Sequence, residues 1–294
     1  DVAGAASRAQ TLTTVESWLM TDTNASSDSD ILARSAHEDE ANLAVRIHTH
    51  QEYTRPRIDF PEWVLDKLPW RGDECVLDIG TGTGNYIALV HERAPNGTLI
   101  GGDLSLKILQ QARAHAGEAN THLTLLDAQR LPFPDETFDV VLANHMLYHV
   151  GHIPSTLDEI KRVLCPDGCL VTATNSAATM EEFDTLARRA CTLLGYPRQQ
   201  FSHPHDRFTL ENGARQLARH FNAVARYDVP SALHFPEVSP ALDYLDSTRD
   251  MLAPELPEAV SWDEFMDVIE KQIQRLIRRD GELRVRKQIG RAHV

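Results

Sequence analysis

Between residues 72 and 176, short apolar runs alternate with amphipathic segments, and this alternation restricts the fold more than any other feature of the chain. CVLDI at 75–79 is typical of a buried strand. Strict alternation of strand and helix is typical of βαβ units, so we predict a parallel α/β sheet covered on both faces. The expected further strands span 98–103, 122–127, 138–144 and 168–174, and the expected helices span 84–93, 105–117 and 154–164.

The segments before this core have a different composition. Residues 1–30 are rich in Ser, Thr, Ala and Asp, which predicts a flexible N-terminal segment. Residues 31–71 carry a helical pattern that ends near Tyr53 and a second short one that begins at Phe60. We expect them to form a helical lid.

The segments after the core predict further helices and strands. Capping boxes at Thr179-x-x-Glu182 and Ser261-x-x-Glu264 predict the starts of two helices, the first ending at Gly195. Two apolar runs, at 221–229 and 283–289, predict late strands. We expect one domain over 72–294, with substrate-recognition insertions around 176–220 and 230–282.

Charge and composition exclude several classes of protein. The chain has 294 residues with 42% hydrophobic content, and no apolar run approaches the roughly 18 residues that a membrane span needs. The formal charge of −14 argues against a nucleic-acid groove, which requires clustered Lys and Arg. The four cysteines form no CxxC pair, as expected for reduced thiols in a cytoplasmic protein. We also expect no association with a membrane.

The glycine-rich stretch VLDIGTGTGNY at 76–86 predicts a ligand site. Gly80, Gly82 and Gly84 follow the first strand and allow close approach of a ligand to the backbone. A dinucleotide fingerprint would place glycine at position 85, where this chain has Asn85. The carboxylate of Asp78 would repel a pyrophosphate but attract an ammonium or a sulfonium. S-adenosylmethionine (SAM) carries both cations.

The next two strands also end in acids. Asp103 lies 25 residues after Asp78, where a carboxylate can accept hydrogen bonds from both ribose hydroxyls of an adenosine. Leu104 follows it and could lie against the adenine. Asp127 ends the third strand and can accept from the adenine amino group. Acids at the same edge of a parallel sheet therefore indicate an adenosine site.

Four segments resemble the successive motifs of class I SAM-dependent methyltransferases: VLDIGTGTG, GGDLS, LLDAQRLPFPDETFDVVLANHMLYHV and LCPDGCLV. The sequence is most similar to the UbiE-like (methyltransferase type 11) group that acts on small molecules. The resemblance is strong over 72–176. One departure is CPDG at 165–168, where this family usually has a lysine-proline-glycine turn.

The resemblance implies a Rossmann-like sheet of seven strands in the order 3-2-1-4-5-7-6, with the last strand, 283–289, antiparallel and a helical lid at the N-terminus. It also implies that Gly80 and Gly82 line the methionine portion of SAM. Together with the residue pattern, it gives an expected cofactor-binding set: Tyr53, Asp78, Gly80, Thr81, Gly82, Gly84, Asn85, Asp103, Leu104, Asp127, Ala128, Gln129, Asn144 and His145.

Methyl transfer from a sulfonium is an in-line displacement, which needs alignment and, when the nucleophile carries a proton, a base. The fourth strand ends at Asn144, so His145 and His149 are the candidate catalytic bases. The alternative is that His149 caps the next helix while His145 shapes the cofactor pocket, because many enzymes of this group use proximity alone.

Two polar stretches are candidates for contact with the methyl acceptor. RIHTHQEYTRPR at 46–57 supplies His48 and His50, and its Tyr53 either closes over the methionine end or packs under the lid. FSHPHDRF at 201–208 supplies His203, His205 and Arg207. We expect no metal, because no set of carboxylates accompanies the His-x-His pair.

We therefore predict a transferase that moves a methyl group from SAM to O, N or C of a small metabolite, with secondary metabolites among the candidates. One alternative is an RNA-base methyltransferase, which the charge disfavours. Arsenite methylation is weakened because the lid has no cysteine. Another alternative is a SAM-binding regulatory protein without catalysis. The sequence leaves the acceptor and a homodimer open.

Overall fold

The alternating apolar runs form the centre of one sheet in the computed structural model, which describes residues 40–117 and 120–294. The segment predicted to be flexible (1–30) and the beginning of the predicted lid (31–39) lie outside these residues. The parallel strands are β2 (Cys75–Ile79), β3 (Thr98–Asp103), β4 (Thr121–Leu125), β5 (Phe138–Leu142) and β6 (Leu164–Asn175). The apolar runs thus locate all five.

The sheet continues through a long hairpin of β7 (Ala225–Phe235) and β8 (Leu283–His293). The complete order is β4-β3-β2-β5-β6-β8-β7-β1, and β8 is antiparallel to both of its neighbours. The predicted seven-strand order is contained in it. The sheet has an eighth strand, however: β1 (Thr54–Arg55) pairs with β7 and is too short for any periodic pattern to predict.

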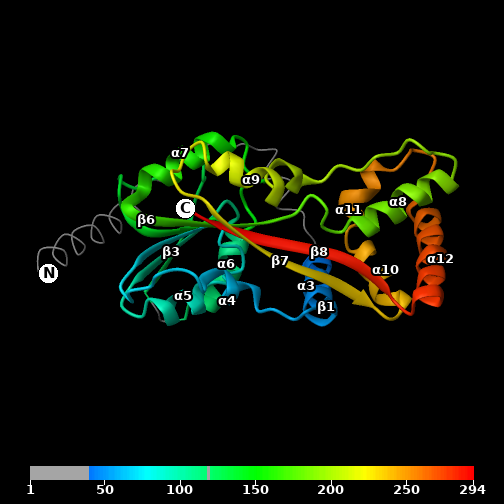
Figure 1. The fold of residues 1–294 in the computed structure, drawn as a ribbon, viewed down its shortest axis with the longest axis horizontal. Coiled ribbons are helices and arrows are strands. Elements are labelled where there is room, and N and C mark those ends of the chain that lie inside the picture. The colour runs from blue at the N-terminus through cyan, green and yellow to red at the C-terminus, as the bar shows by residue number, and fades with distance from the viewer. Residues whose placement is uncertain (1–39, 118–119) are drawn as a thin grey trace, which may run out of the picture.

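Helices cover both faces of the sheet (Figure 1). On one face, α7 (Ile153–Val163) and α9 (Leu210–Leu217) bury apolar side chains in a core that includes the inner residues of β2 and β5. On the other face, a second core joins α4 (Phe60–Leu65), α5 (Ile87–Arg93) and α6 (Leu106–Ala116) to the sheet. The α/β architecture predicted from the sequence is confirmed.

The hairpin extends from the sheet into a group of helices at the other end of the molecule (Figure 1). This helical cap consists of α3 (Glu40–Tyr53), α8 (Glu181–Leu193), α10 (Val238–Asp246), α11 (Arg249–Leu252) and α12 (Trp262–Asp280). Phe183, Phe235, Phe265 and Val285 are buried in its separate apolar core. The short 3-10 helices η1 (Pro204–Arg207) and η2 (Ala253–Glu255) lie in its connections.

The structure bears out only one of the two predicted capping boxes. Ser261 and Glu264 form the reciprocal bonds at the start of α12. The box predicted from Thr179 is wrong, because α8 begins at Glu181 and its N-cap is Met180, which has a left-handed φ of 66° and makes no side-chain cap bond. The Thr179 hydroxyl donates instead to the carbonyl of Gln288, which ties this turn to β8.

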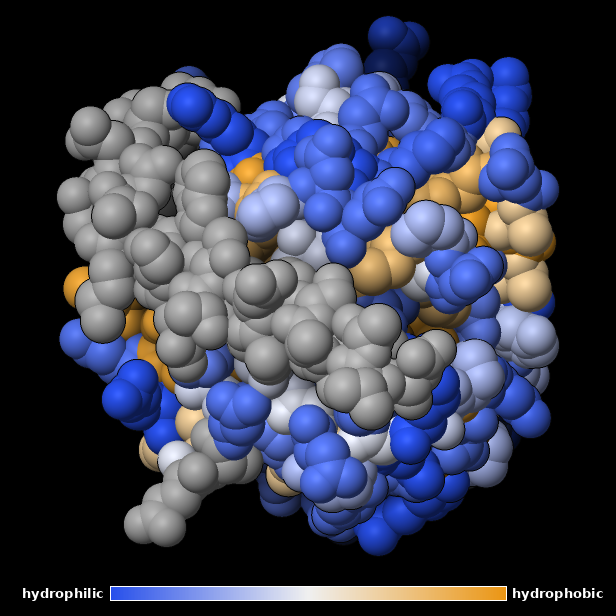
Figure 2. All heavy atoms as spheres, turned by 90° about the vertical axis from the view of Figure 1, so that its left-hand side faces the viewer, coloured by the Kyte–Doolittle hydropathy of each residue, from blue (hydrophilic) through white to orange (hydrophobic). Residues whose placement is uncertain are grey.

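Figure 2 shows the face at the sheet end of the molecule: outside the grey atoms, hydrophilic side chains cover most of it, and apolar side chains appear in separate patches. Single exposed apolar residues are normal on folded proteins. Within residues 40–117 and 120–294, none of the helices combines the length and the apolar content needed to cross a membrane.

Candidate cofactor and active site

The glycine turn connects β2 to α5 with three backbone conformations that favour glycine. Gly80, Gly82 and Gly84 have φ values of 70°, 56° and 88°. The N–H groups of Gly80 and Thr81 donate to the carbonyl of Gly102, at 2.7 and 3.0 Å, which fixes the turn to β3. A Cβ atom at Gly80 would lie 2.8 Å from Cβ of Met146. The turn therefore requires glycine there for both conformation and space.

Asp78 lies inside the turn rather than at an open mouth. It is 1% exposed, and its Oδ2 accepts a hydrogen bond from the hydroxyl of Thr81 at 2.8 Å. Burial raises the pKa of Asp78 to about 7, the Thr81 bond opposes that rise, and the charge of Asp103 adds to it. Near neutral pH this carboxylate would be stabilised by an approaching cation.

The raised pKa of Asp78 gives a testable pH dependence for cofactor binding. A cationic ligand favours the ionised carboxylate, so binding should release a proton below about pH 7. We expect the affinity for SAM to rise as the pH increases from about 5.5 to about 7 and then to level off. Calorimetric titrations near pH 6 in buffers of different ionisation enthalpy would count the proton. Proton uptake on binding would contradict this role.

The same shift predicts the opposite trend for stability. Asp78 has a folded pKa above its ordinary value, so the native state holds a proton that the unfolded chain has lost. Its contribution to the free energy of unfolding should fall as the pH rises from about 4 to about 7. Asp78→Asn should flatten this part of the stability profile, which urea denaturation across that range would measure.

Asp103 organises the end of β3 next to the glycine turn. Its Oδ2 accepts from the N–H of Gly82 at 3.2 Å and its Oδ1 accepts from the N–H of Ser105 at 3.0 Å. The side chain remains partly exposed, and Leu104 beside it is 36% exposed. The carboxylate is thus fixed in orientation while still open to a ligand with vicinal hydroxyls.

Asp127 follows β4, where its Oδ1 accepts from the backbone N–H of Gln129 at 2.9 Å. The side chain of Gln129 in turn accepts from the N–H of His152 at 2.8 Å, and Ala128 between them is buried. The loop is therefore held to the start of α7. Asp127 remains half-buried, with acceptor capacity left for a donor such as an adenine amino group.

Asn144, directly after β5, provides the structural test of whether these residues fit a ligand. It is 8% exposed, and among the residues that the structure describes neither its amide nitrogen nor its amide oxygen has a hydrogen-bond partner. Buried polar groups in proteins are nearly always paired, so an orphaned amide indicates a missing partner. The ammonium and carboxylate of a methionine moiety have the chemistry to bond with it.

His145, the next residue, is held in a strained conformation. Its φ is 54°, its N–H donates to the carbonyl of Ala173 at 2.8 Å, and its ring lies 5.6 Å from that of Phe60. Burial lowers the pKa of His145 to about 4, and the charge of Lys287 lowers it further. Such backbone strain is concentrated at functional sites. The imidazole is neutral at pH 7 and can accept a proton.

The second candidate base lies differently. His149 is exposed, and its N–H donates to the carbonyl of Met146 within the loop that follows β5. Its ring lies 4.5 Å from that of Tyr148. It also acts electrostatically on His145, so the structure brings the two candidates into one electrostatic environment.

The residues predicted to touch the acceptor divide into two groups. His50 and His205 belong to the same electrostatic environment as His145. His48 is exposed, and the ring of Tyr53 stacks on Phe235 of the cap at 5.1 Å.

The other two residues predicted to touch the acceptor, His203 and Arg207, bind other groups of the protein. The Nε2 of His203 lies 3.0 Å from a carboxylate oxygen of Asp184, an interaction that raises the pKa of the histidine. Arg207 donates to the carbonyl of Gly151 at 2.8 Å and thus holds the loop that follows β5.

Lys287 is a site residue that sequence reasoning missed. It lies on β8, and its Nζ donates to the hydroxyl of Thr54 on β1 at 3.3 Å. Burial lowers its pKa to about 8, and its charge acts on both His50 and His145. The sequence carried no signal for it, because only the pairing of β8 with β6 brings position 287 near the end of β5.

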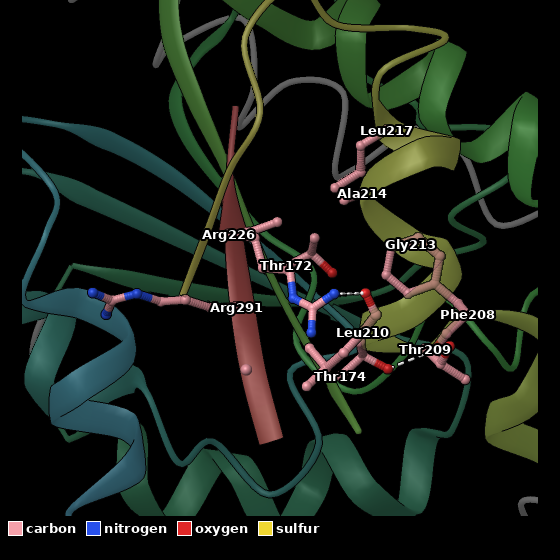
Figure 3. Close-up of a pocket in the computed structure, with 12 residues that line it drawn as sticks. Thr172, Thr174, Phe208, Thr209, Leu210, Gly213, Ala214, Leu217, Arg226 and Arg291 are labelled. Atoms are coloured by element: carbon pink, nitrogen blue, oxygen red, sulfur yellow. Dashed lines mark hydrogen bonds between the residues drawn. The ribbon is translucent and has the colours of Figure 1, made fainter. Parts of the chain in front are cut away.

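A small cavity lies away from this site, between α9 and the strands β6, β7 and β8 (Figure 3). Its volume of about 10 Å³ is at the limit for one water molecule. The hydroxyl of Thr174 donates to the carbonyl of Phe208 at its edge. Arg291 points away from it, and its guanidinium lies 4.1 Å from the Trp63 ring centroid. The cavity is a gap in packing rather than a ligand site.

No cluster with metal-binding character accompanies the site. In the described part of the chain, no group of three or more His, Cys, Asp or Glu side chains is arranged to hold a metal ion. His203 and His205 stack on each other at 5.3 Å instead of converging on one point.

Comparison with known proteins identifies the central segment. The family described as "Methyltransferase domain" matches residues 77–172. UbiE, the ubiquinone/menaquinone biosynthesis C-methyltransferase of Desulfotalea psychrophila, is 39% identical over 106 residues, which cover 36% of this chain and 43% of that protein. The malonyl-[acyl-carrier protein] O-methyltransferase of a Marinomonas strain is 32% identical over 145 residues, 48% of this chain and 54% of that protein.

Solved structures support the fold. Phosphoethanolamine N-methyltransferase 2 of Haemonchus contortus, in complex with SAM, superposes with a TM-score of 0.54 at 17% identity, covering 92% of this chain and 60% of that one. The chain spans about half the length of the curated relatives that it matches. The segment that matches the family, residues 77–172, contains the glycine turn, the end of β2 and the strands β3 to β5.

Proposed function

We propose that the chain transfers a methyl group from SAM to O, N or C of a small metabolite. The premise is that residues 77–172 form a class I SAM-dependent methyltransferase domain of the UbiE-like group. The observation that carries this proposal is the orphaned amide of Asn144, buried at the edge where the glycine turn and Asp103 also lie. A buried unpaired amide beside an adenosine-type carboxylate matches a ligand with a nucleoside at one end and an amino acid at the other.

Each residue group at the carboxyl ends of the parallel strands has a proposed role in holding the cofactor. The carboxylate of Asp103 would accept from the ribose hydroxyls, Asp127 would accept from the adenine amino group, and Leu104 would lie against the adenine. Gly80 and Gly82 would let the methionine portion approach the backbone, with Asp78 offsetting its positive charge. When bound, SAM would supply an electrophilic methyl group.

The remaining members of the expected cofactor set are adjacent to these residues. Thr81 bonds to Asp78, and Gly84 has a φ of 88°, a backbone conformation that favours glycine. Asn85 is exposed at the end of the turn. We therefore assign these residues to shaping the turn.

The protein's own contribution to the reaction is alignment and, for an acceptor that loses a proton, a base. His145 is the first candidate because its neutral imidazole lies next to Asn144 at the end of β5. We expect His145→Ala to lower kcat by roughly 100-fold while leaving the affinity for SAM within about threefold of wild type. His149→Ala is the matched comparison. Loss of SAM affinity in His145→Ala would make it a pocket residue instead.

The helical cap is the proposed source of acceptor specificity. Segments 176–220 and 230–282 build most of it, and α3 of the lid packs against α10 and β7. Substrate-binding elements appended to a methyltransferase sheet can change without disturbing the cofactor edge. We assign 72–294 to the methyltransferase domain and 31–71 to the lid, although α4 of the lid packs on the sheet rather than in the cap.

Transfer of a labelled methyl group tests the function. After incubation of the protein with [methyl-¹⁴C]SAM and a bacterial metabolite extract, we expect label in the acid-soluble small-molecule fraction. Label in RNA would favour the base-methyltransferase alternative. Binding of SAM without transfer into any of a series of extracts would favour the regulatory alternative.

A further inference from the structure

Lys287 occupies an unusual position for a lysine. It is half-buried on β8, whereas Lys67, Lys107, Lys161 and Lys271, the other four lysines, are exposed. Its Nζ donates to the Thr54 hydroxyl, and within the described residues it forms no ion pair with a carboxylate. An ammonium has three donors, so this one has capacity for an additional acceptor.

The groups around Lys287 are other bases. We define the Lys287 cluster as Lys287, His50 and His145. His50 is joined to Lys287 through Thr54, whose hydroxyl accepts from the Lys287 Nζ and donates to the His50 carbonyl, and the charge of Lys287 acts on His145. The Nδ1 of His50 is buried and has no hydrogen-bond partner among the described residues, which indicates that a polar partner completes the cluster.

The electrostatics of the cluster are one-sided. Burial lowers the pKa of His50 to about 3, and Lys287, His145 and Arg46 lower it further by repulsion. The pKa of His145 is lowered in the same way, by burial and then by Lys287, His149 and His205. Among the described residues no carboxylate forms an ion pair with the half-buried Lys287 ammonium. Such an ammonium is unfavourable, and an anion would stabilise it.

We propose that the Lys287 cluster binds the methyl acceptor through an organic oxyanion (a carboxylate, a phenolate or an enolate) held by the Lys287 ammonium. This inference rests on the proposed function and names its substrate class. His50 can add a hydrogen bond to the same oxyanion through its Nδ1, which has no partner among the described residues. The acceptor is thereby a small organic anion rather than a neutral or cationic molecule.

The geometry favours the acceptor over the carboxylate of SAM as the source of the oxyanion. β8 lies three strand intervals from β2, which carries the glycine turn, or about 14 Å at the usual spacing of strands. Lys287 is instead next to β1 and α3, on the side where the sheet meets the cap. The methyl donor and the oxyanion would therefore approach His145 from opposite sides.

Nuclear magnetic resonance of lysine side chains tests this site without knowledge of the acceptor. The full chain labelled with [ε-¹³C]lysine has five signals, and Lys287→Arg identifies the one that belongs to Lys287. Protein saturated with S-adenosylhomocysteine (SAH) is titrated with acetate at constant ionic strength, and separately with acetamide as the uncharged probe. We expect the Lys287 signal alone to shift saturably with acetate and to stay unchanged with acetamide.

Three other outcomes would overturn the proposal. One is a Lys287 signal that does not move with acetate, and another is equal movement with acetamide. The third is a Lys287 shift that SAH produces and 5′-methylthioadenosine does not, together with loss of the response to acetate when SAH is bound. In that case the carboxylate of the methionine moiety would occupy the site. A separate titration with SAM tests the proposed function itself, so failure of the two claims can be told apart.

Discussion

Replacing Asp103 with alanine is expected to lower the affinity for SAM and for SAH by at least about 100-fold. Two charge-assisted hydrogen bonds from ribose hydroxyls stabilise a complex by roughly 1.5–3 kcal/mol each. The same carboxylate accepts the N–H of Gly82 and of Ser105, so its loss also releases the glycine turn from β3. Both effects weaken binding of the same ligand.

Calorimetric titration of the variant measures this effect, and Asp158→Ala is its matched control. Asp158 is a 70% exposed carboxylate that pairs with His220 on the outside of α7, away from the carboxyl edge of the strands. We expect the control to bind SAM as wild type does. An Asp103→Ala protein that melts normally and keeps its affinity would remove Asp103 from the cofactor site.

Replacing Gly80 with alanine is expected to abolish detectable SAM binding and to lower the free energy of unfolding by about 2–5 kcal/mol. A residue with Cβ at a φ of 70° carries roughly 1–2 kcal/mol of backbone strain. The new Cβ would also lie 2.8 Å from the Cβ of Met146, and relief of that overlap costs about 1–3 kcal/mol more. The movement would displace the turn on which the ligand rests.

Gly195→Ala separates the two contributions. Gly195 has a φ of 98°, but a Cβ built there meets no atom within 4 Å. Urea denaturation should therefore show the backbone term alone, with unchanged SAM affinity. Equal destabilisation in both variants would mean that crowding by Met146 has no effect, and full SAM binding by Gly80→Ala would exclude a close approach of the ligand.

β2, β3 and β5 could be predicted from the sequence because nearly every residue of each is buried. β2 and β3 begin and end at the predicted residues. The hairpin strands were harder, because β7 and β8 extend beyond the sheet and expose many residues of the alternating pattern. The predicted strand at 221–229 was placed four residues too early, and both strands were predicted too short.

The position of the acids at the carboxyl ends of β2, β3 and β4 could be predicted from the sequence because of the topology of the sheet. Carboxyl ends of parallel strands meet at one edge, so Asp78, Asp103 and Asp127 had to be neighbours once the strands were located. The same argument does not predict the position of Lys287. Its proximity to His145 depends on the register of an antiparallel strand, in which Asn175 pairs with Ile289, and on β1, which consists of two residues.

Calorimetric titration of the wild-type chain with SAM and with NAD⁺ tests the central claim most directly. The acids at the ends of β2 to β4, the absent glycine at position 85 and the orphaned Asn144 all favour a cationic adenosine over a pyrophosphate. We predict one-to-one binding of SAM and no binding of NAD⁺. Binding of NAD⁺ by a chain that ignores SAM would contradict the account.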